Sequence, residues 1–60
     1  MDSKYNVHQE FRLKHNPEIV FKIRMVMHHK KHVDYTMENI VTNECIKIKD
    51  TVFDDIFIKK

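Results

Sequence analysis

The fold of this chain depends on the stretch His8-Gln-Glu-Phe-Arg-Leu-Lys-His-Asn-Pro-Glu-Ile-Val20. In its first half Phe11 and Leu13 alternate with charged residues, which is the two-residue period of a β-strand. Asn16-Pro17-Glu18 then supplies three helix-start signals, an N-cap residue, a first-turn proline and a first-turn acid. The stretch therefore predicts a strand that leads directly into a helix. Because a single strand has unpaired backbone groups on both edges, its partner must come from a second molecule or from the C-terminal third of the chain.

The strand is expected at about residues 7–14 and the first helix at about residues 17–30. Apolar residues recur at helical spacing at Val20, Ile23 and Met27. The alternative is a second strand after a hairpin turn at residues 15–18, because a two-residue alternation also runs through residues 19–27. Both interpretations stay open for this segment, and the helix is the one adopted.

The C-terminal half predicts a second helix at about residues 34–49 and a short helical extension at residues 50–60. Its apolar face would consist of Met37, Ile40, Val41, Cys45 and Ile48. The alternative pairs two strands, Cys45–Lys49 with Val52–Ile58, and gives an α+β fold of order ββαββ. The predicted class is mainly α with one short strand.

Composition limits the class of protein. The chain has 60 residues, no glycine, one proline and one cysteine, so it forms one domain without an internal disulfide, and oligomerisation is the usual way to stabilise so small a core. No apolar run approaches the length of about 20 residues that a membrane span needs, and the N-terminus does not resemble a signal peptide. A cytoplasmic protein without a membrane partner is expected. Abundant lysine, isoleucine and asparagine without glycine suggest an AT-rich source, viral or plasmid-borne.

Three groups of residues carry a family resemblance. They are Gln9-Glu-Phe-Arg-Leu-Lys14, then Pro17-Glu18 with Val20, Ile23 and Met27, and finally Val33, Met37 and Val41. In this order the chain resembles the ribbon-helix-helix (Arc/Mnt/MetJ-like) DNA-binding repressors over roughly residues 8–48. It departs from the family at Lys30-Lys31-His32, where Gly or Asn is common, and in the added tail at residues 50–60.

The resemblance implies an intertwined homodimer, or a tetramer on DNA, that represses transcription by inserting a two-stranded ribbon into the major groove of double-stranded DNA. The residues it places on base edges are Glu10, Arg12 and Lys14, with His8 at the margin. Expected phosphate contacts are Asp34, Tyr35, Thr36, Lys4, Lys30, Lys31 and His32. The dimer core would be Phe11, Leu13, Val20, Ile23, Met27, Met37, Ile40 and Val41.

Other chemistry is weakly indicated. His28 and His32 lie one helical turn apart and could share a metal ion, but the sequence offers only His15 and Cys45 as distant third ligands, and the two intervening lysines repel a cation. We therefore expect no metal, no cofactor and no catalytic residue. The alternative function is a non-enzymatic inhibitor or antitoxin that acts by protein–protein contact, through residues 50–60 or through an open sheet edge.

Overall fold

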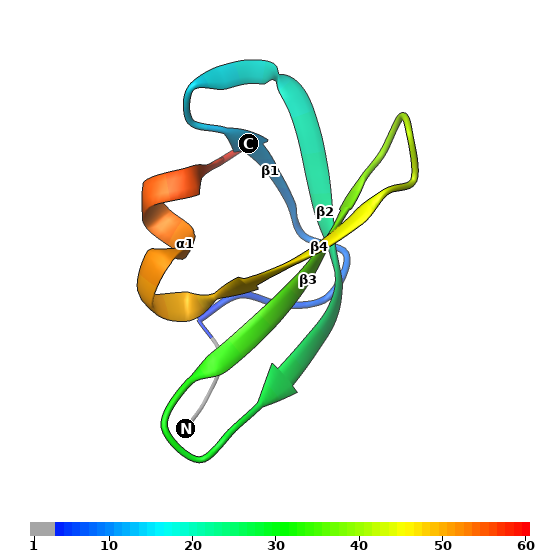
Figure 1. Cartoon of the computed structure of the whole chain (residues 1–60). Helices are drawn as coiled ribbons and strands as arrows, with labels where there is room; N and C mark the ends of the chain where they lie inside the picture. The colour runs from blue at the N-terminus through cyan, green and yellow to red at the C-terminus, as the bar shows by residue number, and fades with distance from the viewer. Residues whose placement is uncertain (1–3) are drawn as a thin grey trace.

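The computed structural model describes residues 4–60, which form one antiparallel sheet and one short helix (Figure 1). In chain order the elements are β1 (Glu10–Leu13), β2 (Asn16–His28), β3 (Val33–Asn39), β4 (Cys45–Lys49), α1 (Asp50–Ile56) and β5 (Phe57–Lys59). The spatial order of the strands is β4-β3-β2-β1-β5. Consecutive strands β1 to β4 are therefore neighbours, and the last strand returns to the far edge beside β1.

The predicted ribbon-helix-helix fold is wrong. Strands account for 56% of the described residues and helix for 12%, so the class is β-rich rather than mainly α. Both long helices, expected at residues 17–30 and 34–49, are replaced by strands and loops. The α+β class of the alternative agrees with the structure, but its order ββαββ is wrong, because β3 occupies the place of its central helix and the observed helix comes before the last strand.

The helix-start signals at Asn16-Pro17-Glu18 lie at an irregular place in the sheet. The register of β1 and β2 shifts between Arg12, which pairs with Val20, and Leu13, which pairs with Asn16. Residues 17–19 are thereby left out of the β1 pairing. A proline is tolerated at the start of a strand or at a bulge, where the missing N–H is not needed. Pro17 therefore marks an interrupted ladder rather than a first helical turn.

Strand β2 joins two parts of the sheet. Its first half pairs with β1, and its second half, from Phe21 to His28, pairs with β3. The β3 register shifts between Ile23 and Met25, so Arg24 forms a bulge near the middle of the strand. Bulges bend a strand and increase its twist. Figure 1 shows β2 crossing the whole molecule, with α1 to one side between the ends of β4 and β5.

Both edges of β1 are paired within the chain. Phe11, Arg12 and Leu13 pair with β2 on one side and with residues 57–59 of β5 on the other. One partner, β5, comes from the C-terminal third, which is one of the two expected sources. The other partner, β2, is the segment directly after β1, for which the sequence predicts a helix. This pairing replaces the two-chain ribbon on which the family resemblance depended.

The core draws its buried residues from every element except β4, whose Ile48 is half-buried against it. Its buried members are Phe11, Phe21, Ile23, Val33, Tyr35, Met37, Phe53 and Phe57. Among the residues expected in a dimer core, Phe11, Ile23 and Met37 are buried and Leu13 and Val20 are half-buried, whereas Met27, Ile40 and Val41 are exposed. The strand geometry explains why these three are exposed. Met27 lies on the outer face of the sheet opposite Asp34, and Ile40 and Val41 lie in the β3–β4 loop. Within residues 4–60 no helix is long and apolar enough to cross a membrane.

Candidate metal centre

The tight turn between β2 and β3 brings two histidines face to face. The apolar alternation of β2 ends at His28, and four polar residues follow before β3 begins at Val33. The backbone N–H of His29 donates to the carbonyl oxygen of His32 at 2.8 Å, so Lys30 and Lys31 form the exposed tip of the turn. His29 and His32 thus flank a closed two-residue turn on a hairpin whose strands are paired up to its base.

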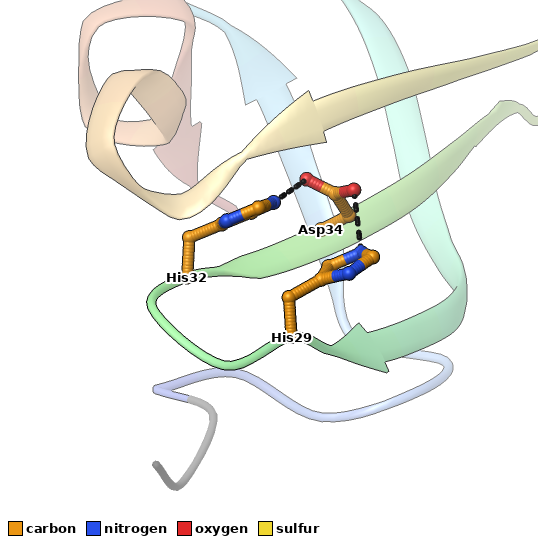
Figure 2. Close-up of side chains that lie close together, drawn as sticks. All are labelled: His29, His32 and Asp34. Atoms are coloured by element: carbon orange, nitrogen blue, oxygen red, sulfur yellow. Dashed lines mark ion pairs between the residues drawn. The ribbon is translucent and has the colours of Figure 1, made fainter.

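Asp34 completes a cluster with these two histidines. It lies two residues after His32, and alternate residues of a strand point to the same face. Nε2 of His29 lies 2.9 Å from Oδ2 of Asp34, and Nε2 of His32 lies 3.4 Å from Oδ1. The imidazole rings stack with their centroids 4.4 Å apart. Figure 2 shows both rings directing a nitrogen towards the one carboxylate.

The carboxylate of Asp34 is more buried than the imidazoles that cover it. Its side chain is 12% exposed, against 37% for His29 and 30% for His32. Met27 of β2 and Lys49 of β4 are its neighbours in the adjacent strands. The cluster is therefore shielded by the sheet and open to solvent through the histidine rings, which gives a ligand a route of entry.

A second acid on the same face of β3 provides a comparison. Glu38 is 11% exposed and pairs with the permanently charged groups of Lys22, at 3.9 Å, and Arg24, at 3.4 Å. The partners of Asp34 are imidazoles instead, and a neutral imidazole is the commonest metal ligand in proteins. Of the two acids, only Asp34 is surrounded by groups able to bind a metal ion with it.

The donor set fits a transition-metal ion. The nearest donor atoms of the three residues all lie within 4.8 Å of one another. Ligands held about 2.1 Å from a tetrahedral zinc ion are about 3.4 Å apart, so small side-chain movements would bring these atoms into place. Two nitrogens and one carboxylate oxygen favour zinc, copper, nickel or iron over calcium or magnesium. Three protein ligands would leave at least one coordination position open to water.

Sequence reasoning found one of these ligands and missed the set. It paired His32 with His28 at helical spacing, but in the hairpin His28 is paired with Val33, on the opposite face from Asp34. It assigned Asp34 to a DNA phosphate, and it considered His15 and Cys45, which lie in the β1–β2 turn and at the start of β4. The available signal was a pair of histidines flanking a two-residue polar turn, with an acid two positions further on.

The residues predicted to contact DNA bases are spread along β1 and its flanks. Arg12 and Lys14 are exposed, and the guanidinium of Arg12 donates to the carbonyl oxygen of Pro17 at 3.4 Å. His8 is exposed with a positive φ of 75°. Nζ of Lys60 lies 2.7 Å from a carboxylate oxygen of Glu10, and this hydrogen bond lowers the pKa of Glu10.

The residues predicted to contact phosphates do not form one surface. Tyr35 is buried in the core, and Thr36 is half-buried beside it. Lys4 lies in the N-terminal segment, where Nζ is 3.2 Å from Oδ2 of Asp54 in α1. The hydroxyl of Tyr5 donates to the other oxygen of the same carboxylate at 2.9 Å. These two hydrogen bonds, that of Tyr5 first, lower the pKa of Asp54, and the bond to Asp54 raises the pKa of Lys4.

Comparison with known proteins gives no match among family models, curated proteins or solved structures. The site is therefore interpreted from its own geometry.

Proposed function

We propose that this protein binds one divalent transition-metal ion, with Zn²⁺ as the first ion to test, through His29, His32 and Asp34. The observation that carries the proposal is the convergence of two imidazole nitrogens and a largely buried carboxylate within 4.8 Å. The closed turn and the paired strands hold the three residues in place before any ion arrives. A preorganised site loses less side-chain entropy on binding than a flexible one.

The site would hold the ion with a position open to solvent. Such a centre can accept a further donor from water or from another molecule, in contrast to a four-ligand structural site. Protons and the metal ion compete for the same imidazole nitrogens, so metal affinity should fall in acid. The proposal concerns binding, and the expectation that the chain is not an enzyme stays a prediction.

Calorimetric titration of Zn²⁺ into tag-free protein tests the proposal. We expect binding of one ion per chain, and His29→Ala or Asp34→Asn should weaken it at least about tenfold, the effect typical of losing a ligand or its partner. His15→Ala is the matched control, because it removes an exposed histidine from a different hairpin turn. NMR spectra of the same samples should show the largest changes at the β2–β3 turn.

Two results would contradict the metal proposal. One is a wild-type chain without stoichiometric binding of Zn²⁺, Ni²⁺ or Co²⁺ at neutral pH. The other is binding that falls equally in the His15→Ala control and in His29→Ala. Either would mean that the cluster serves only as a hydrogen-bonded cap on the hairpin.

Repression through DNA binding, a homodimer and a protein partner at residues 50–60 stay predictions. The DNA prediction has lost its structural basis, because the exposed ribbon it required is replaced by pairing within the chain. A cytoplasmic location is likewise a proposal.

A further inference from the structure

Strand β4 is an exposed edge of the sheet. Among residues 4–60 it is the outermost strand on its side, with β3 as its one neighbour in the sheet. Four of its five residues are exposed, and Ile48 is half-buried. An edge of this kind presents backbone groups that another extended segment can pair with.

The register of the β3–β4 hairpin identifies those backbone groups. The N–H of Asn39 donates to the carbonyl oxygen of Glu44 at 2.8 Å, which makes these residues a hydrogen-bonded pair. Hydrogen-bonded pairs alternate along an antiparallel ladder. Cys45 and Lys47 therefore direct their N–H and C=O groups away from β3, towards the open side. Lys49 directs its N–H there as well, but its C=O is the N-cap carbonyl of α1 and accepts the first hydrogen bond of the helix.

The side chains of the same strand define the chemistry of a partner. Lys47 and Lys49 pair with Thr36 and Asp34, so both lysines lie on the outer face of the sheet, two residues apart. Ile46 pairs with Met37 on the other face and is 41% exposed. Strand β4 contains no acid. A complementary strand would carry acids at alternate positions and apolar residues between them.

A second copy of this chain fits the edge poorly. Antiparallel pairing of two β4 strands centred on Lys47 would place like charges directly opposite each other, which destabilises a sheet. Lysines on edge strands are a common protection against such self-pairing. The same lysines attract an acidic strand.

We propose that β4 binds an extended acidic segment of a partner protein, which adds to the sheet as a further strand beyond β4. The N–H and C=O groups of Cys45 and Lys47 and the N–H of Lys49 would form the ladder, and the two lysines would select acids at alternate positions. The partner's apolar residues would cover Ile46. This interaction surface borders the metal centre, because Lys49 pairs with Asp34, but it does not require a bound ion.

NMR titration of ¹⁵N-labelled protein with a blocked six-residue peptide of alternating Glu and Val tests the inference. The reference is a peptide of alternating Lys and Val of equal length. We expect the acidic peptide to shift the amides of Cys45, Lys47 and Lys49, to slow their hydrogen exchange, and to bind about tenfold more tightly than the reference. Binding should weaken with added salt.

Variants of the two lysines separate strand addition from general charge attraction. Lys47→Pro removes an outward N–H together with the Lys47 charge, without removing a hydrogen bond of the β3–β4 ladder, and Lys47→Ala removes the charge alone. Binding should be abolished by the proline and only weakened by the alanine, while the spectra of both free proteins keep their β3–β4 contacts. Changing Lys47 and Lys49 together to glutamate should reverse the preference towards the lysine peptide. Unchanged binding of the acidic peptide to Lys47→Pro, the lack of shifts in β4 with either peptide, or a β4–β4 dimer would each overturn the proposal.

Discussion

Replacing Phe53 with alanine is expected to remove most of the stability of this domain. Phe53 lies in α1 and is 1% exposed. Its ring centroid lies 4.9 Å from that of Phe11 and 5.0 Å from those of Tyr5, Tyr35 and Phe57. The ring thus connects the N-terminal segment, β1, β3 and β5, so its removal would affect every part of the core.

The size of the effect follows from burial. Truncation of a buried phenylalanine to alanine costs about 3–5 kcal/mol, because transfer free energy is lost and a cavity is left behind. A domain of 60 residues has a total stability of about 3–9 kcal/mol. At the middle of both ranges Phe53→Ala would leave about 2 kcal/mol of stability, so the chain should unfold at a much lower urea concentration. Phe53→Leu should cost less because it fills more of the space.

Urea denaturation followed by circular dichroism measures the change. Val52→Ala is the matched control, because Val52 precedes Phe53 in the same helix and is 43% exposed. We expect this control to change the free energy of unfolding by less than about 0.5 kcal/mol. Equal and small effects of the two substitutions would refute the packing of α1 into the core. In that case the tail would be an extension of a separately folded domain, as the family resemblance implied.

The remaining predictions concern charge. Asp54→Asn should make the free energy of unfolding, measured by urea denaturation, depend less on pH in acid. The pKa of Asp54 is lowered in the folded state, so its carboxylate stabilises the fold fully at pH values above the ordinary pKa of 3.8. This contribution is lost as the pH falls through the lowered pKa. An unchanged curve would contradict the role of its hydrogen bonds. Changing Lys30 and Lys31 together to serine should tighten Zn²⁺ binding about threefold at low salt and hardly at high salt, since two like charges are removed from the turn. Equal Zn²⁺ affinities of this variant and the unchanged protein at low salt, measured by calorimetry, would contradict this effect. If the chain binds DNA as predicted from the sequence, fluorescence anisotropy should show that the affinity for DNA falls steeply with added salt and is weakened by Arg12→Ala or Lys14→Ala. An affinity that does not change with salt would refute DNA binding through these residues.

The expected elements differ from the observed ones for physical reasons that can be located. The strand expected at residues 7–14 contains β1, because the alternation of Phe11 and Leu13 with charged residues is a local property. Residues 19–27 carry both a helical and a strand period, and the signals around Pro17 favour the helix. The strand is favoured because this segment pairs with β1 and β3. Those partners lie elsewhere in the chain, so the sequence of the segment alone does not reveal the pairing.

The candidate site was hidden for the same reason. His29, His32 and Asp34 are close in sequence, but on a helix they would not share the arrangement that they have in the hairpin. A two-residue turn with paired strands places both rings over the carboxylate. The pairing register that produces this turn depends on Tyr35 and Met37 packing into the core, so the site is a consequence of the fold.

By itself the sequence determined the local features of this protein: the alternation in β1, the polar break at residues 28–32, and a short C-terminal helix that follows Asp50. Tertiary structure decided the rest. It paired β5 with β1, turned residues 16–28 into one long bent strand, and gathered the metal-binding candidates on one hairpin. The physical reason is that a strand forms its hydrogen bonds with residues distant in the chain, whereas a helix forms them with its own neighbours. A helical period can therefore be recognised in one segment, but a sheet is decided only when all of its strands and the core between them are present together.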